Sequence, residues 1–318
     1  MRVAMKKMLR GPFTRSLEVA ARWSSRRVGL ALVYHKLGDT QDREGHLVAA
    51  LGAELFERQM RHLKAHYRPV PASGLLDAVR ERRRGESIPV AVTFDDDLRS
   101  HVGIAMPILR RLGVPATFFV CGASLDGPHA FWWESLQLAF DRQGAETVGE
   151  LLPASIRRGA STPTIREAAR AIEALPTAEK EEISDLILHQ IGGDPPDAGL
   201  READLRSLVE SGFEIGFHTR RHPVLPNLTD GDLPAALTDG RERIEAIMGG
   251  PVRIISYPHG KADQRVAQTA RAAGYVLGFT TEARAFHEGD DPLLIGRPYP
   301  DYGGDMRFTL ELARTLRN

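Results

Sequence analysis

The order of elements along the chain limits its fold more than any other feature. Short apolar runs typical of strands alternate with segments in which apolar residues recur at helical spacing. The strand-like runs are residues 28–35, 68–71, 90–94, 115–121, 213–217, 252–257, 275–280 and 293–295. The expected helices are residues 54–67, 73–84, 104–112, 232–248, 263–273 and 306–316. This α/β alternation predicts a parallel sheet of about seven strands, closed or nearly closed into a distorted (β/α) barrel.

A doubly wound open sheet is the alternative architecture. It is disfavoured because no glycine-rich nucleotide-binding turn follows the first strand-like run. The length of 318 residues suits one large domain. We expect that domain to span residues 28–318, with a helix-rich insertion at about 134–210 and a separate basic segment, residues 1–27, before it.

Composition argues against several classes of protein. The 42 Lys and Arg residues balance the 42 Asp and Glu residues, so no overall basic field favours a nucleic-acid partner. Cys121 is the single cysteine, and it lies in an apolar run where a packed, inert thiol is expected. No apolar run reaches the length of about 18 residues that a membrane-spanning helix needs. Because no secretory signal is recognisable, the sequence predicts a cytoplasmic protein.

Residues 1–27 have a basic amphipathic pattern. Glu18 is the one acid, and apolar residues alternate with the basic residues Arg2, Lys6, Lys7, Arg10, Arg15, Arg22, Arg26 and Arg27. This pattern is typical of a helix that lies on an anionic membrane surface. An extra helix packed against the outside of the domain, with a solvated basic face, is the alternative.

Two strand-like runs end in side chains that can bind a metal. The run Val90–Phe94 is followed by three carboxylates, Asp95, Asp96 and Asp97, and a later run is followed by His218 and His222. A solvated acidic turn would explain the carboxylates alone. One helical turn after the second strand would bring the two histidines to the same side. An aspartate with two histidines is then a sound ligand set for a zinc-like ion with an open position.

Three motifs in this order resemble the polysaccharide deacetylase (NodB-homology, carbohydrate esterase) family. They are Thr93-Phe94-Asp95-Asp96, His218-Thr219-Arg220-Arg221-His222-Pro223 and Ser256-Tyr257-Pro258-His259-Gly260. The resemblance extends from about residue 30 to about residue 300, apart from the helical middle. It implies a metal-dependent hydrolase that removes an N-acetyl group from an amino sugar of a polysaccharide, an oligosaccharide or a glycan precursor.

The resemblance also implies a role for each matching residue. Asp95 matches the general base, and Asp96, His218 and His222 match the ligands of a divalent metal, Zn²⁺ first, with Co²⁺, Ni²⁺ or Mn²⁺ as alternatives. The backbone N–H of His259 matches the donor that stabilises the oxyanion. The family's general acid is a late histidine, for which His287 is the candidate. His35 and the His259 side chain are the other candidates.

Several positions depart from the family's pattern. Asp97 stands where the family commonly has glycine, so a third carboxylate joins the site and a left-handed turn is expected there. Ser256 stands where the family often has an arginine that orients the base. Arg297 offers a guanidinium from another direction, or else forms a surface ion pair. The aromatic run Phe131-Trp132-Trp133 suits either stacking on a sugar ring or burial under a loop.

Two other functions remain open from the sequence. A catalytically impaired, glycan-binding relative would keep the fold without turnover. A hydrolase of another non-peptide C–N amide, such as a formamide on a lipid-linked or nucleotide-linked sugar, would keep the chemistry and change the bond. A carbohydrate is the expected partner in each case, and the sequence does not predict the oligomeric state.

Overall fold

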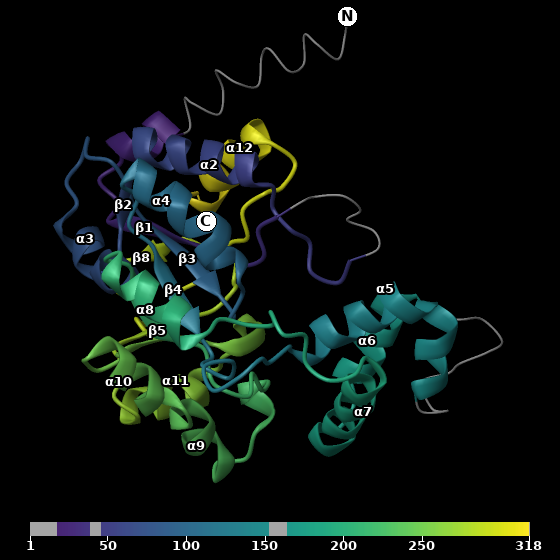
Figure 1. Ribbon diagram of the computed structural model, residues 1–318. Helices are drawn as coiled ribbons and strands as arrows, with labels where there is room; N and C mark the ends of the chain where they lie inside the picture. Colours follow the sequence, from purple (N-terminus) through teal and green to yellow (C-terminus); the bar gives the residue numbers. More distant parts are fainter. Residues whose placement is uncertain (1–17, 39–45, 153–163, 318) are drawn as a thin grey trace, which may run out of the picture.

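The computed structural model describes residues 18–38, 46–152 and 164–317 (Figure 1). Its centre is one sheet in which seven strands follow the order β7-β6-β5-β4-β3-β1-β8, and β2 pairs with β3 beside this path. The strands are β1 Val28–Tyr34, β2 Arg68–Val70, β3 Pro89–Asp95, β4 Thr117–Val120, β5 Glu214–Phe217, β6 Ile254–Ser256, β7 Leu277–Phe279 and β8 Phe286–His287. All the pairings are parallel except that of β8 with β1. The sheet is a curled, incomplete barrel, which confirms the predicted fold class.

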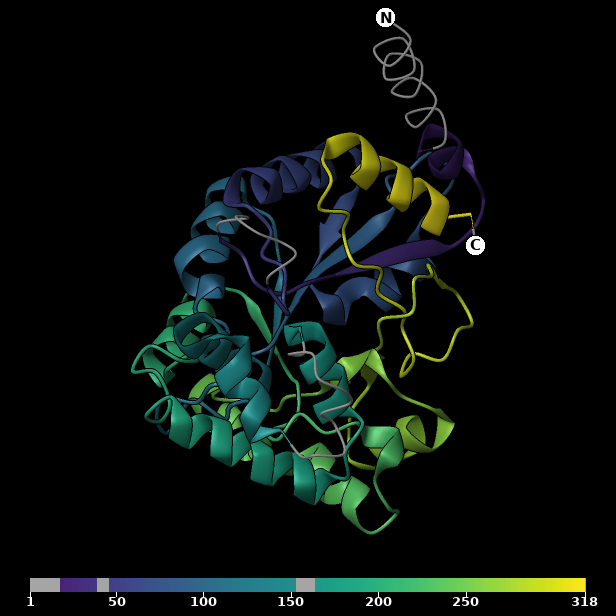
Figure 2. The same ribbon diagram turned by 90° about the vertical axis from the view of Figure 1, so that its right-hand side faces the viewer.

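Helices cover the outer side of the curled sheet (Figure 2). They are α2 Ala53–His66, α4 Met106–Leu112, α8 Glu202–Glu210, α9 Asp232–Thr238, α10 Arg241–Met248, α11 Gln264–Ala272 and α12 Asp305–Thr315. Helix α3 Leu75–Glu81 instead contributes Leu75 and Val79 to the apolar cluster on the inner side of the sheet. The single helix predicted over residues 232–248 is in fact two, because the chain turns at Gly240 with a φ of 80°. A positive φ of this kind ends a helix and favours glycine.

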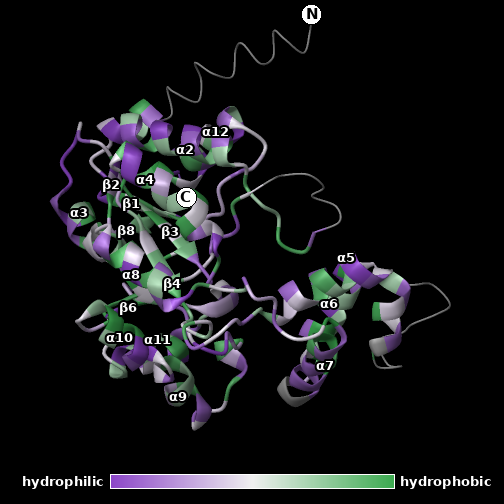
Figure 3. Cartoon of the chain, viewed as in Figure 1, coloured by the Kyte–Doolittle hydropathy of each residue, from purple (hydrophilic) through white to green (hydrophobic). Residues whose placement is uncertain are grey.

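Two apolar clusters fill the two sides of the sheet. The outer cluster joins Leu30, Leu32 and Tyr34 of β1 to the helices, whereas the inner cluster contains Ala31 of the same strand. Successive residues of a strand point to opposite faces, so one apolar run supplies both clusters. Hydrophobic residues accordingly follow the strands, and hydrophilic residues lie on the outer faces of the helices (Figure 3).

The helical insertion has a third apolar cluster of its own. It consists of α5 Trp132–Leu151, α6 Ile165–Glu173 and α7 Thr177–Gln190, which pack around residues such as Leu136, Ile172 and Ile187. These helices stand together to one side of the sheet (Figure 1). The insertion ends earlier than predicted, because α8 places Leu205 and Leu208 in the outer cluster of the barrel.

The last part of the chain also differs from the prediction. Residues 293–295 form only a single bridge, between Ile295 and Phe279 of β7. The segment around His287 contains a short strand that was not expected, β8, which pairs with the start of β1. Among the described residues, no helix is both long enough and apolar enough to span a membrane.

Candidate metal centre and catalytic site

The sequence motifs meet along one edge of the sheet. Asp95 is the last residue of β3, His218 follows β5 directly, and Ser256 is the last residue of β6. The strands β3, β4, β5 and β6 are parallel neighbours, so their carboxyl ends lie along the same rim. In barrels of this kind, the loops at that rim build the functional site.

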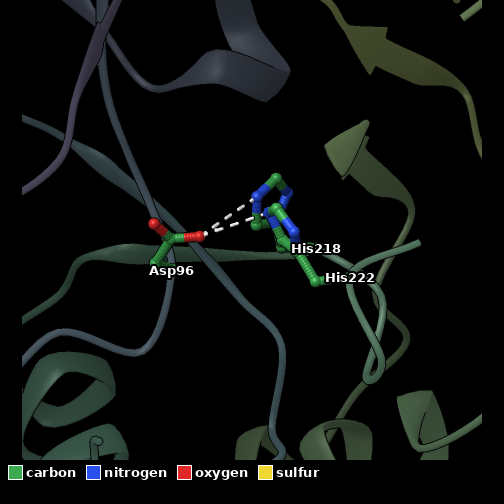
Figure 4. Close-up of side chains that lie close together, drawn as sticks. All are labelled: Asp96, His218 and His222. Carbon is green, nitrogen blue, oxygen red and sulfur yellow. Dashed lines mark ion pairs between the residues drawn. The ribbon is translucent and has the colours of Figure 1, made fainter. Parts of the chain in front are cut away.

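The three predicted metal ligands come together at this rim (Figure 4). Oδ1 of Asp96 lies 3.4 Å from Nε2 of His218 and 3.6 Å from Nε2 of His222. One donor atom from each residue can be chosen so that all three lie within 4.8 Å of one another. Asp96 Oδ1 is buried and accepts no hydrogen bond from the described residues. A buried oxygen without a partner, facing two imidazoles, fits a cation bound among them.

The hydrogen bonding of His218 prepares its other nitrogen for a metal. Nδ1 lies 2.8 Å from the backbone oxygen of Ser256, which can only accept, so Nδ1 carries the proton. Nε2, which faces Asp96, therefore keeps its lone pair in the neutral ring. Such an outer hydrogen bond is the usual way in which proteins fix the orientation of a metal-binding histidine.

The backbone around the site is held in left-handed conformations. The non-glycine residues with positive φ among those described are Asp96 at 76°, Thr219 at 58°, His222 at 49° and His259 at 57°. All four lie in the loops of this rim. The histidine pair is thus joined by a turn, in which His222 N–H donates to Thr219, and not by the expected helical turn. It is also Asp96, and not Asp97, that adopts the left-handed turn. Strain of this kind persists where surrounding contacts hold it, and it is frequent at functional sites.

Asp95 is held by a buried network centred on Arg297. The guanidinium donates to both carboxylate oxygens, at 2.8 Å to Oδ1 and 2.6 Å to Oδ2. It also donates to Thr93, Ser256 and the backbone oxygen of Thr280, and Ser256 Oγ donates to Asp95 Oδ2 at 2.9 Å. Arg297 is fully buried, so the surface ion pair considered from the sequence is wrong. Arg297 and Ser256 together orient the carboxylate, although Ser256 has replaced the family's usual arginine.

This network keeps the Asp95 carboxylate ionised. Burial by itself raises the pKa of Asp95, but the Arg297 charge, the neighbouring His218, the hydrogen bonds from Arg297 and the nearby His35 together outweigh it, so the pKa falls to about 2. Arg297 occupies one acceptor position on Oδ1, and a carboxylate oxygen has a second. Asp95 can therefore accept a proton at Oδ1 while it remains paired with Arg297.

Asp97 points away from the metal centre. Its Oδ1 accepts a hydrogen bond from the backbone N–H of Cys121 at 2.8 Å, and its Oδ2 accepts one from Ser124 Oγ at 3.1 Å. Burial raises the pKa of Asp97, although these hydrogen bonds favour its charged form. The third carboxylate thus ties the end of β3 to the loop after β4, and it adds no ligand to the set of Asp96, His218 and His222.

The structure separates the candidates for the general acid. His287 pairs with Val28 at the start of β1, whereas the site lies beyond the end of that strand. Seven residues of strand span about 20 Å, so His287 is not brought to the site. His35 follows Tyr34, which pairs with Phe94, and therefore lies level with Asp95 on the neighbouring strand. Its ring stacks on Tyr299, with ring centres 5.6 Å apart.

The insertion and the third motif form the other wall of the site. The His222 ring lies 4.6 Å from the His259 ring and 4.9 Å from that of Trp133. Phe131 is buried and stacks on Trp133 at 4.4 Å, so these two aromatics support a metal ligand. Glu173 of α6 lies 3.8 Å from His259. Sequence reasoning missed the contacts of the insertion with His222 and His259, because nothing in the local pattern of α6 indicates which loop it faces.

The sequence of this chain matches a known protein family. The sequence model of the family described as polysaccharide deacetylase matches residues 82–278, more than half of the chain. The chain therefore belongs to the polysaccharide deacetylase family.

Individual relatives are distant. The Bacillus subtilis (strain 168) protein YxkH, named as a polysaccharide deacetylase, is 20% identical over 232 residues, which cover 72% of this chain and 58% of that protein. The Streptococcus pyogenes deacetylase PplD, solved in complex with acetate, has a TM-score of 0.61 at 16% identity and covers 91% of this chain and 98% of its own. The structure of IcaB from Ammonifex degensii has a TM-score of 0.58 at 19% identity, and the match covers 92% of this chain and 97% of IcaB. At these identities the two structures show a shared fold.

Proposed function

We propose that the protein is a metal-dependent hydrolase that removes the N-acetyl group from an amino sugar of a glycan. The observation that carries this proposal is the set of Asp96, His218 and His222, which face one another beside a carboxylate that Arg297 holds ionised. The family match supports a carbohydrate substrate. The acetate in the PplD structure is the product expected of such a reaction in that relative.

Asp96, His218 and His222 would hold the ion, and two nitrogens with one carboxylate oxygen suit Zn²⁺ first, with Co²⁺, Ni²⁺ and Mn²⁺ as alternatives. A bound divalent ion at this place supplies Lewis acidity toward the acetamide carbonyl and lowers the pKa of water. Asp95 Oδ1 takes the proton of the attacking water, and Arg297 fixes the direction of that oxygen. The backbone N–H of His259, in a left-handed turn beside His222, is the proposed donor to the developing oxyanion.

His35 is the proposed donor of the proton to the leaving amine. It lies level with Asp95 at the same rim, whereas His259 contacts the ring of the metal ligand His222. We expect His35→Gln to lower kcat about 10²-fold to 10⁴-fold, the usual contribution of general acid catalysis. The matched variant His287→Gln is expected to keep wild-type kcat. Steady-state acetate release over a range of pH measures both, and a normal rate in His35→Gln would assign the proton transfer elsewhere.

Metal content provides the direct test of the proposed site. Elemental analysis of wild-type protein is expected to find about one divalent ion per chain, and His218→Ala is expected to lose it because a three-ligand site cannot lose one ligand without a large fall in affinity. His189→Ala, which changes an exposed histidine of the insertion, is the matched control and is expected to keep the ion. Acetate release from N-acetylglucosamine oligomers then tests turnover.

Each combination of results has a definite meaning for the proposal. Metal and acetate release that are both lost in His218→Ala support it. Absence of metal from wild-type protein after reloading with zinc would contradict the metal centre. A bound metal without release of acetate or formate from amino-sugar substrates would favour the glycan-binding alternative.

A further inference from the structure

The described part of the chain begins with a short helix that exposes apolar side chains. Val19 is 53% exposed and Trp23 is 58% exposed, although most large apolar residues of the protein are buried. They lie four residues apart within residues 18–23, so they share one face of the helix. An exposed tryptophan beside a second apolar residue has a hydration cost that contact with another apolar surface would remove.

The orientation of this helix is fixed by buried contacts on its other side. Glu18 accepts hydrogen bonds from Tyr67 and pairs with His62 at 2.9 Å. At the other end, the buried Arg82 donates to backbone oxygens of the helix and of the segment that follows it, those of Ala21, Arg22, Ser24 and Arg26. The carbonyls of Ala21 and Arg22 lie in the last turn of the helix, where carbonyls have no partner in a further helical turn. The exposed face is therefore a fixed part of the surface.

Arginines surround the exposed tryptophan. Nε of Arg22 donates to the backbone oxygen of Gly85 at 2.7 Å, and Nε of Arg84 donates to that of Trp23 at 2.9 Å. Arg26, three residues after Trp23, is also exposed. Bonds to neutral carbonyls leave Arg22 and Arg84 without a carboxylate partner among the described residues. We define Val19, Arg22, Trp23, Arg26 and Arg84 as the N-terminal face.

We propose that the N-terminal face binds the surface of a membrane that contains anionic phospholipid. Tryptophan and valine suit the boundary between headgroups and acyl chains, and arginines beside them suit lipid phosphates. The sequence before the face adds to the same charge, because residues 1–17 contain five basic residues and no acid. A nucleic acid would use the arginines but would gain little from Val19.

Membrane contact through this face leaves the catalytic rim accessible from water. The face precedes the start of β1 and the rim lies beyond its end, which separates them by about 20 Å along a strand of seven residues. The enzyme would then work near the membrane on a glycan that enters from the aqueous side. This inference does not depend on the proposed deacetylation.

Co-sedimentation of the full chain with vesicles tests the proposal. We expect tighter binding to phosphatidylcholine vesicles with about a third phosphatidylglycerol than to phosphatidylcholine alone, and weaker binding at high salt. Trp23→Glu is expected to weaken binding at least about tenfold, and Arg26→Glu about fivefold or more, because each basic residue near an anionic surface contributes about that factor. Matched controls are Val276→Glu, at an apolar residue 50% exposed elsewhere, and Arg110→Glu on α4.

The outcomes separate a lipid surface from other partners. Loss in Trp23→Glu and Arg26→Glu, with normal binding in both controls and unchanged melting temperatures, supports the proposal. Equal affinity for both vesicle types, or an unchanged affinity in Trp23→Glu, would overturn it. Binding to duplex DNA that falls in Arg26→Glu but not in Trp23→Glu, without vesicle binding, would also overturn it in favour of a nucleic acid.

Discussion

Asp95→Asn is expected to lower kcat about 10²-fold to 10⁴-fold while the protein keeps its metal. An amide has nearly the same shape as the carboxylate but does not take up a proton from water at neutral pH. The metal ligands are unchanged, because Asp95 supplies none of the three donor atoms. Acetate release and elemental analysis on the same preparation give the two measurements.

The matched control for Asp95→Asn is the neighbouring change, Asp96→Asn. It is expected to lose metal and activity together, since it weakens a ligand. If Asp95→Asn also lost its metal, or if Asp96→Asn kept full activity, the assignment of base and ligand to these two residues would be reversed or wrong. Thermal unfolding of both variants is needed as well, because Asp95→Asn leaves the buried Arg297 charge without its carboxylate partner.

Arg297→Met is expected to have the largest effect on stability. Removing one partner of a buried ion pair costs about 3–5 kcal/mol of the free energy of unfolding, because the remaining charge is left uncompensated. Here the remaining group is Asp95, which is 2% exposed, and its carboxylate would lose both hydrogen bonds from the guanidinium. We also expect lower kcat, because the base loses its fixed orientation. Urea unfolding and acetate release measure the two effects.

Arg82→Met separates the two effects of losing a buried arginine. Arg82 is also buried, but it binds backbone carbonyls at the N-terminal helix and lies outside the catalytic rim. We expect this variant to be destabilised while kcat per folded molecule stays normal. In Arg297→Met, kcat per folded molecule should fall. Equal kcat values in the two variants would show that Arg297 acts on stability alone.

Combining Asp95→Asn with Arg297→Met should lower the free energy of unfolding by less than the sum of the two single changes, since the two groups form one pair.

The local pattern of the sequence predicted the strands β1 to β7 and gave Asp96, His218 and His222 as candidate ligands, which the structure brings together. Strand-like runs end at Asp95 and at His218, and parallel strands bring their carboxyl ends to one rim. Those features depend on the spacing of residues that are close in the sequence. The third motif was found from its resemblance to the family, and the structure places Ser256 at the end of β6, on the same rim.

Only the tertiary structure decided the direction of individual side chains at that rim. Asp97 was a possible ligand in the sequence, but the left-handed turn at Asp96 sends it to Cys121 and Ser124. The antiparallel pairing of β8 placed His287 at the wrong end of β1. Neither result follows from local spacing, because each depends on which strand or loop becomes the neighbour.

Arg297 shows most clearly the difference between what the local sequence predicts and what only the tertiary structure decides. The sequence by itself indicated that three carboxylates follow a strand-like apolar run and can bind a metal, with a solvated acidic turn as the alternative. The structure places the Arg297 guanidinium beside Asp95, from a position 202 residues further along the chain. Local periodicity reports which face of an element is buried, whereas the pairing of a buried charge is settled by the packing of distant segments around it.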